Sequence, residues 1–261
     1  MGYRPTLLYS RPLPELAKRL DATIDRGCER YRRTRAIELF FRADDIGVPS
    51  RLFCRLIELF QHHQMPLCLA VVPSWLTAKR LATLQEITGR ENGRWCWHQH
   101  GRRHLNFEAA GKKQEFGPAR TPEIIQTELQ RGLDRLHRLM GDRLSPFFTP
   151  PWNRCSLTTV TILKTLGFRA LSRSQGARPE VSHILPDLPV NVDLHTRKEP
   201  TVAASLASLL TELEEGLASG RCGIMIHHQR MNDNAFLLLD LLLSQLARRP
   251  ELTVVTFADL L

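Results

Sequence analysis

Short apolar segments alternate with amphipathic segments along most of this chain, and this alternation constrains the fold more than any other feature. The candidate strands are residues 37–43, 66–72, 94–98, 145–149, 168–172, 188–192, 222–226 and 252–257. A regular alternation of strands and helices predicts a parallel sheet, and seven or eight units in about 220 residues favour a barrel. Near-continuous apolar strands are typical of a sheet that is covered on both faces.

The predicted fold is therefore α/β, a distorted (β/α)7–8 barrel in residues 36–261 that follows an N-terminal helical extension in residues 1–35. In the extension, Leu16, Leu20 and Ile24 recur at helical spacing. Between the strands, the segment 121–140 has a clear helix start, because Thr121 can cap the helix and a proline follows it at the first helical position.

The amino-acid composition limits the kinds of binding partner and the cellular compartment that we expect for this protein. The net charge is +9, but the basic residues are scattered, and neither a basic stripe nor a nucleic-acid-binding module is present. The six cysteines are widely spaced without a Cys-x-x-Cys pair, which predicts free thiols in a reducing environment. No apolar run is long enough to span a membrane, and no secretory signal is recognised at the start. We therefore expect a cytoplasmic protein; the sequence does not predict its oligomeric state.

Five polar clusters begin where apolar segments end. They are Asp44-Asp45, His98-Gln99-His100, Pro150-Pro151-Trp152-Asn153, Asp193 with His195, and His227-His228. In a parallel α/β barrel the carboxyl ends of all strands open on one face, and that face carries the active site. The sequence therefore predicts that these five groups converge on one site.

Asp45, His100 and His104 offer one carboxylate and two imidazoles, a common open ligand set for catalytic zinc. The two histidines are four residues apart, so one helical turn would place them on the same face. Taken separately, the histidines could be ordinary surface residues, and the aspartates could cap the following helix. Taken together, they predict a metal site.

At this point the sequence resembles a known family. FRADDIG, HGRRH, FTPPWN, PVNVD and IMIHH resemble, in order, the five motifs of the polysaccharide deacetylases, the NodB-like carbohydrate esterase family four. The resemblance extends from about residue 37 to residue 230. FRADDIG is also similar to the opening of the YdjC-like deacetylases, so the subfamily stays open.

The resemblance implies a metal-dependent hydrolase that removes an N-acetyl or other N-acyl group from an amino sugar or glycan precursor. Asp44 would be the general base, and Asp45, His100 and His104 would bind one divalent ion. Zinc is the first choice for this ion, with cobalt, nickel and manganese as alternatives. The substrate would be a small molecule, an oligosaccharide or a lipid-linked glycan.

The resemblance also assigns the remaining site residues. His227 would be the general acid, with His228 as the alternative, and Asp193 would be the aspartate of the fourth motif. The backbone N–H of Trp152 would stabilise the oxyanion, because the preceding Pro151 has no N–H to donate.

This chain departs from the motifs at Thr149, where the family usually has an arginine that holds the base carboxylate. We expect Arg154 or Arg102 to substitute by reaching Asp44 or Asp193. The lack of a recognised secretory signal favours a soluble or lipid-linked precursor over a cell-wall polymer.

Several alternatives stay open. Similar barrels open cyclic amides or deformylate amino sugars, and a degenerate barrel could bind a glycan without turnover. His98 could hydrogen-bond near the site or pack in the core, and Trp75 could stack on a sugar or pack internally. Trp95 and Trp97 are expected to pack under helices. The loop 111–120 is expected to be an ordinary exposed loop, with contact to a substrate anion as the alternative.

Overall fold

The computed structural model describes residues 5–89 and 93–261, which form two compact units. The first unit contains the described residues up to Ala43, then Ser50–Leu67 and Asn191–Leu260. The second contains Asp44–Pro49, Cys68–Val190 and Leu261. Each unit is described by itself below.

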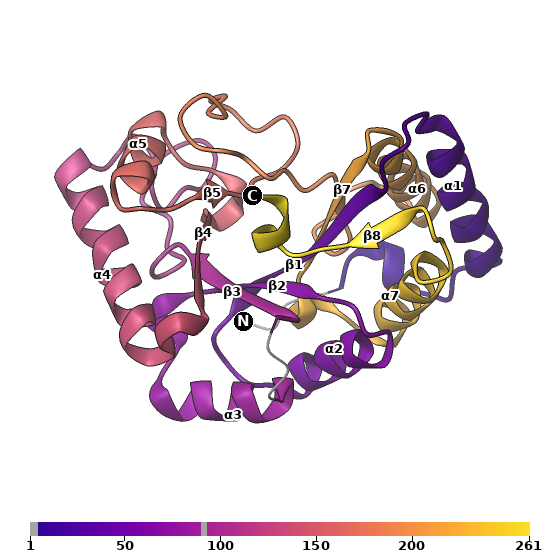
Figure 1. The fold of residues 1–261 in the computed structure, drawn as a ribbon, viewed down its shortest axis with the longest axis horizontal. Helices are drawn as coiled ribbons and strands as arrows, with labels where there is room; N and C mark the ends of the chain where they lie inside the picture. The colour runs from indigo at the N-terminus through magenta and orange to yellow at the C-terminus, as the bar shows by residue number, and fades with distance from the viewer. Residues whose placement is uncertain (1–4, 90–92) are drawn as a thin grey trace. The chain divides into compact units, whose positions relative to one another are not determined.

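The first unit is built on parallel strands that pair in the order β8-β1-β7-β6 (Figure 1). These strands are β1 (Ile37–Ile46, whose last three residues belong to the second unit), β6 (Val192–Asp193), β7 (Arg221–Ile226) and β8 (Leu252–Val254). Its helices are α1 (Leu16–Arg30), α2 (Arg51–His62), α6 (Val202–Ala218) and α7 (Asp233–Leu246). Phe40 packs edge-on against Phe257, and the next residue, Phe41, packs against Phe60 of α2. Successive strand residues face opposite sides, so both faces of β1 are covered.

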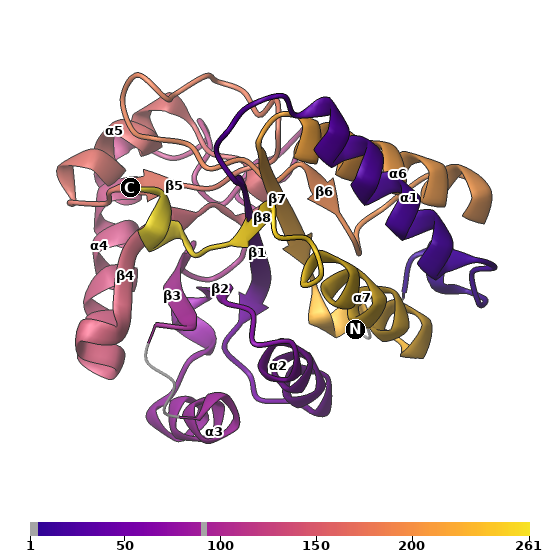
Figure 2. The same ribbon diagram turned by 45° about the vertical axis from the view of Figure 1, so that its right-hand side comes forward.

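Helix α1 lies alongside α6 (Figures 1 and 2). It buries Leu16, Leu20 and Ile24, the residues whose spacing predicted the helix. The two helices approach closely at Gly27, where a Cβ atom would lie 2.8 Å from the Cβ of Leu217. Only a residue without a side chain permits this packing.

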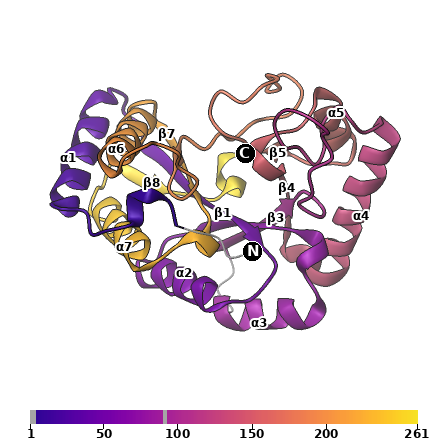
Figure 3. The same cartoon turned by 180° about the vertical axis from the view of Figure 1, so that it is seen from behind.

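The second unit has parallel strands in the order β5-β4-β3-β2. They are β2 (Leu67–Val71), β3 (Trp95–His100), β4 (Leu144–Thr149) and β5 (Ala170–Leu171), and the helices are α3 (Ala78–Thr88), α4 (Pro122–Met140) and α5 (Leu157–Thr165). Helices α4 and α5 lie side by side (Figures 1 and 3). Phe148 of β4 is fully buried and packs edge-on against Phe116 and Phe168. Truncating such a buried phenylalanine to alanine typically costs about 3–5 kcal/mol.

Helices α2 to α7 each begin at a residue whose side chain accepts a hydrogen bond from a backbone N–H of the first turn. These residues are Ser50, Thr77, Thr121, Ser156, Thr201 and Asn232. Each such cap contributes about 1 kcal/mol and fixes where the preceding loop ends. Among the described helices, none has both the length and the apolar character needed to cross a membrane.

The α/β class is confirmed, and six of the eight predicted strands are found close to their predicted positions. The segments predicted at 168–172 and 188–192 are mostly irregular, and they contribute only the two-residue strands β5 and β6. Strands β1 and β3 extend further than predicted. Asp44, Asp45 and His100 therefore lie in the last residues of strands rather than after them.

Candidate metal centre

Asp45, His100 and His104 bring three metal-binding atoms together in the second unit. Their ligand atoms all lie within 4.8 Å of one another. Asp45 Oδ1 is 3.4 Å from His100 Nε2 and 3.2 Å from His104 Nε2. Within residues 5–89 and 93–261 this is the one group of at least three His, Cys, Asp or Glu residues with such geometry. One carboxylate and two imidazoles leave coordination positions open for water and substrate, so these residues fit a divalent ion.

Thr149 fixes the orientation of His100. The His100 Nδ1 atom lies 2.8 Å from the Thr149 carbonyl oxygen, which can only accept, so this nitrogen carries the proton. The Nε2 atom faces Asp45 Oδ1 at 3.4 Å, and it is the nitrogen that would bind an ion once its own proton is displaced. A metal-binding histidine usually donates its other ring N–H in this way, and the bond sets the tautomer.

Thr149 also holds His98, the third residue from the end of β3. His98 is fully buried, and its Nε2 lies 2.9 Å from the Thr149 hydroxyl. His98 therefore supports the strand that carries His100. This contact combines the two roles considered for His98, since the residue is both packed in the core and hydrogen-bonded next to the site.

His104 reaches the site from a loop, not from a helix. Residues 101–104 form no helix, and Gly101 and His104 both have left-handed backbone conformations with φ near 59°. The expectation that one helical turn places His100 and His104 on one face is wrong. The two imidazoles meet because β3 ends at His100 and the chain then reverses sharply at Gly101.

Two indole rings flank His104. The ring centroid of Trp152 lies 4.5 Å from that of His104, and the centroid of Trp75 lies 5.8 Å from it. Both tryptophans are partly exposed, as His104 is. Trp75 therefore belongs to the surroundings of the site and is not a residue of the distant core.

The charges in this group favour a cation. Burial is the largest influence on His100 and disfavours its charged form, but the hydrogen bond to Asp45 and the charges of Asp44 and Asp45 outweigh burial and raise the pKa. Burial, followed by the charge of His100, lowers the pKa of His104 to about 4. His104 is therefore neutral at pH 7 with a lone pair to offer, and ion binding would displace the proton of His100.

The backbone is strained at the site. Asp45, His104, Trp152 and Asn153 all have positive φ angles between 57° and 64°. Residues other than glycine adopt this region at a cost of about 1–3 kcal/mol, and such residues gather where a precise geometry is needed. Among the described residues other than glycine, four of the six with positive φ thus coincide with sequence-predicted site segments.

The turn after β4 places the predicted oxyanion donor. Asn153 donates its N–H to the Pro150 carbonyl at 2.9 Å, and Arg154 donates to the Pro151 carbonyl at 3.3 Å. The backbone N–H of Trp152 makes no hydrogen bond to any residue that the structure describes. This N–H is therefore available to a ligand, and its role as an oxyanion donor stays a prediction.

The predicted acid, His227, lies in the first unit directly after β7 and is half-buried. Its backbone N–H donates to Nδ1 of His195 at 3.2 Å. His195 is fully buried, and its ring packs against Tyr9 at a centroid distance of 5.5 Å. The neighbouring His228 is buried against Phe53, with ring centroids 5.6 Å apart. Since His228 lies in the core, His227 is the better candidate for an acid.

Asp193 shapes the turn that carries His195. Its carboxylate accepts the backbone N–H groups of His195 and Thr196 at 2.9 Å each, and it also accepts the Thr196 hydroxyl. Among the described residues, no hydrogen bond joins the Asp193 carboxylate to the His227 imidazole. The catalytic role that the sequence assigns to Asp193 therefore stays a prediction, and its observed contacts are structural.

The arginines do not behave as expected. The guanidinium of Arg102 pairs with Glu128 of α4, and Arg154 forms no ion pair with any described residue. Arg102 therefore pairs with Glu128 rather than with Asp44. The expectation that an arginine reaches Asp193 stays a prediction. In the first unit, Arg197 donates to the Asp193 backbone carbonyl at 2.8 Å while its guanidinium is held by two glutamates.

Sequence reasoning missed the role of Glu115. The loop 111–120 was expected to be exposed, but Glu115 has no exposed surface, and its carboxylate accepts backbone N–H groups from the segment that carries His104. The one sequence feature that could have indicated the burial of Glu115 is its position as a single acidic residue between a basic stretch and the apolar Phe116.

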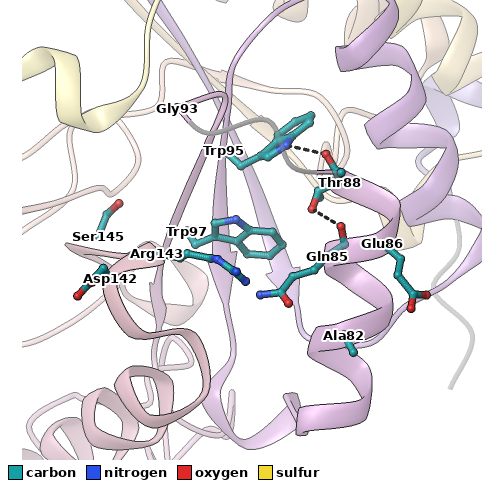
Figure 4. Close-up of a pocket in the computed structure, with 11 residues that line it drawn as sticks. Ala82, Gln85, Glu86, Thr88, Gly93, Trp95, Trp97, Asp142, Arg143 and Ser145 are labelled. Atoms are coloured by element: carbon teal, nitrogen blue, oxygen red, sulfur yellow. Dashed lines mark hydrogen bonds between the residues drawn. The ribbon is translucent and has the colours of Figure 1, made fainter.

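A large cavity lies away from these residues. It has a volume of about 1040 Å³ and opens between the end of α3 and the starts of β3 and β4, at the opposite end of β3 from His100. Figure 4 shows Trp95 and Trp97 projecting from β3 toward α3, and Trp95 donates its indole N–H to the Thr88 carbonyl at 3.0 Å. Both indoles are at least nine-tenths buried, so the expected packing under a helix is confirmed.

Comparison with known proteins gives no match among family models or curated sequences. Solved structures do match. A protein from Mycobacterium smegmatis described as a polysaccharide deacetylase is 15% identical, with a TM-score of 0.65 over 88% of this chain and 90% of that one. A family 4 acetyl xylan esterase from Clostridium thermocellum, in complex with a cobalt ion, is 14% identical, with a TM-score of 0.57 over 85% and 89% of the two chains.

A third structure is a family 4 pseudoenzyme from Bacillus anthracis, which is 12% identical with a TM-score of 0.57 over 87% of this chain and 66% of that one. Together these likenesses show the fold. The chain has the α/β barrel fold of the NodB-like polysaccharide deacetylases, carbohydrate esterase family four.

Proposed function

We propose that this chain is a metal-dependent hydrolase that removes an N-acetyl or other N-acyl group from an amino sugar or glycan precursor. The observation that carries the proposal is the Asp45–His100–His104 group, next to the buried carboxyl of Asp44. A purely structural role would not require these three ligand residues together. Nor would it require a His100 tautomer fixed by Thr149, or a strained backbone at Asp45 and His104.

A divalent ion bound by these three residues would supply Lewis-acid polarisation and a water of lowered pKa, and zinc suits the ligand set best. In the proposed reaction Asp44 takes a proton from the attacking water as general base. The backbone N–H of Trp152 donates to the oxygen of the acyl carbonyl as charge develops on it. His227 gives a proton to the departing amine, which is otherwise a poor leaving group.

The flanking tryptophans support a sugar as the substrate. Trp75 and Trp152 are partly exposed and both lie next to His104, and an aromatic face is a suitable surface for a sugar ring. We extend the proposal to a free or lipid-linked amino sugar in a reducing, cytoplasmic environment. The six cysteines support this environment, since all of them are free thiols.

The test combines a metal assay with product analysis. Purified protein is loaded with Zn²⁺ or Co²⁺, and acetate release is measured on a panel of N-acetylated mono- and oligosaccharides. Wild-type protein should release acetate, whereas Asp44→Asn should bind the metal and release almost none. Wild-type protein that binds metal but hydrolyses no amide in the panel would contradict the deacetylase assignment.

A second candidate is a barrel of the same fold that binds a glycan without turnover. It is favoured by Thr149, whose hydroxyl and carbonyl both contact histidines at the position where the motif usually has an arginine. Wild-type protein that binds a glycan but no metal would favour this reading. Release of formate, or opening of a cyclic amide, would instead point to a related hydrolase of another carbon–nitrogen bond.

A further inference from the structure

The carboxylate of Glu115 is surrounded by three consecutive backbone N–H groups. Oε2 accepts from Arg102 and from His104, at 3.1 Å each, and Oε1 accepts from Arg103 at 2.6 Å. The third of these donors is the backbone N–H of the metal-binding residue His104 itself. A carboxylate that accepts several backbone N–H groups forms strong, charge-assisted hydrogen bonds.

Glu115 is itself held firmly. It has no exposed surface, and the carbonyl of the next residue, Phe116, accepts the N–H of Ser156 at 2.9 Å and the hydroxyl of Thr159 at 2.8 Å. Arg120 donates to the Glu115 carbonyl at 3.3 Å while its guanidinium stacks on the Phe107 ring. The start of α5 thus fixes the backbone next to Glu115.

Gly101 makes room for this arrangement. A Cβ atom on Gly101 would overlap Glu115 Oε2 and lie 2.5 Å from Cγ of Pro151, and its φ of 59° also favours glycine. The opposite side of the same segment is fixed as well, since the Arg102 carbonyl accepts the N–H of Ser74 at 2.9 Å. The segment that turns from His100 to His104 is therefore clamped on both sides.

We propose that Glu115 is a positioning residue that holds the Gly101–His104 segment in the conformation required for His104 to bind the metal. This inference rests on the proposed metal-dependent function. Glu115 is not part of the ligand group, which consists of Asp45, His100 and His104. Glu115 acts on the metal site indirectly. Its three hydrogen bonds offset the energetic cost of the left-handed backbone conformation at His104, and a flexible loop would not maintain that conformation.

The test measures metal affinity and ligand geometry in folded protein. Zn²⁺ affinity is obtained by competition with a chelator, and the visible absorption spectrum of the Co²⁺ form reports the coordination of the ion. Glu115→Gln keeps the size of the side chain but turns an N–H₂ group toward backbone donors. Its Zn²⁺ affinity should fall about 10-fold, and that of Glu115→Ala by up to about 100-fold, with an altered Co²⁺ spectrum. Gly101→Ala should resemble Glu115→Gln, since the added methyl group displaces the same carboxylate.

Glu108→Gln is the matched control. Glu108 belongs to the same loop region and also accepts a backbone N–H, that of Ala119 at 3.2 Å, but it does not touch the ligand segment. This variant should bind Zn²⁺ as wild type does. Unchanged affinity and an unchanged Co²⁺ spectrum in Glu115→Gln would overturn the inference while leaving the proposed function intact. Loss of the far-ultraviolet circular dichroism spectrum in metal-free Glu115→Gln would also overturn it, because Glu115 would then hold the whole unit. Wild-type protein that binds no metal would instead defeat the proposed function.

Discussion

The Nδ1 atom of His100 lies 2.8 Å from the backbone carbonyl oxygen of Thr149, on the neighbouring strand β4. A side-chain substitution at position 149 cannot remove this acceptor, because it belongs to the backbone. The tautomer of His100 therefore depends on the pairing of β3 with β4, and it should be preserved in variants that change only the Thr149 side chain.

Replacing Thr149 by valine tests whether the hydroxyl and the backbone carbonyl of Thr149 act independently. The hydroxyl that contacts His98 is lost in a fully buried place, so the free energy of unfolding should fall by about 1–3 kcal/mol. Zn²⁺ affinity should stay close to the wild-type value, since the carbonyl still holds His100. Urea unfolding and chelator competition measure the two quantities. Thr161→Val is the control, because Thr161 makes a similar bond on an exposed helix surface. A large loss of metal in Thr149→Val would show that the hydroxyl also acts on the ligands.

The metal content of purified variants tests the ligand set. Wild-type protein should hold about one divalent ion per chain, and His104→Ala should lose it, because two remaining ligands bind zinc poorly. His62→Ala is the control, since His62 is exposed at the end of α2 and lies outside the ligand group. Elemental analysis after gel filtration gives the stoichiometry. A triple alanine variant at 45, 100 and 104 that still holds one ion per chain would rule out this site.

The two neighbouring aspartates should respond differently to substitution. Asp44→Asn should keep the metal and lose turnover by about 10²–10⁴-fold, the usual loss when an acid–base group is removed. Asp45→Asn should weaken Zn²⁺ binding itself, because the ligand charge is lost. Parallel measurements of kcat and Zn²⁺ affinity separate the two effects. Equal losses of metal in both variants would mean that base and ligand are assigned wrongly.

The buried His195 should make stability depend on pH. Burial, followed by the charges of His227 and His228, lowers the pKa of His195 well below its ordinary value. The unfolded chain binds a proton at His195 below about pH 6.5 and the folded chain does not, so stability should fall as pH drops from about 6.5 toward the folded pKa. One such group contributes a slope of up to about 1.4 kcal/mol per pH unit.

His195→Gln should reduce this slope by the contribution of one proton, while above pH 7 the difference from wild type should be constant. Denaturant unfolding of both proteins between pH 4.5 and 8 provides the comparison. Parallel stability curves over the whole range would show that His195 titrates in the folded state as it does in the unfolded chain, and that its pKa is not lowered.

The sequence predicted the strands and the residues of the Asp45–His100–His104 group because both depend on local patterns. Runs of apolar residues identify strands covered on both faces, and polar residues at their carboxyl ends identify the site. The same reasoning placed Asp45 and His100 at the correct ends of β1 and β3.

The geometry of His104 could not be predicted in this way. A separation of four residues suggests a helical turn, but left-handed backbone angles at Gly101 and His104 depend on contacts with Glu115 and Ser74, which are distant in sequence. The sequence could not indicate the partner of Arg102 either, because Glu128 comes close to Arg102 only in the folded second unit. Non-local hydrogen bonds decided each of these points.

The loop between His104 and Glu115 is closed at its base, where Phe107 donates its N–H to the Gln114 carbonyl at 3.0 Å. Beyond this closure, residues 109–113 are exposed. Doubling the length of a flexible loop costs only about 0.6 kcal/mol. The tip can therefore be lengthened or randomised without moving His104, which makes it the natural insertion point for a library that seeks new substrate preferences on an unchanged metal-binding scaffold.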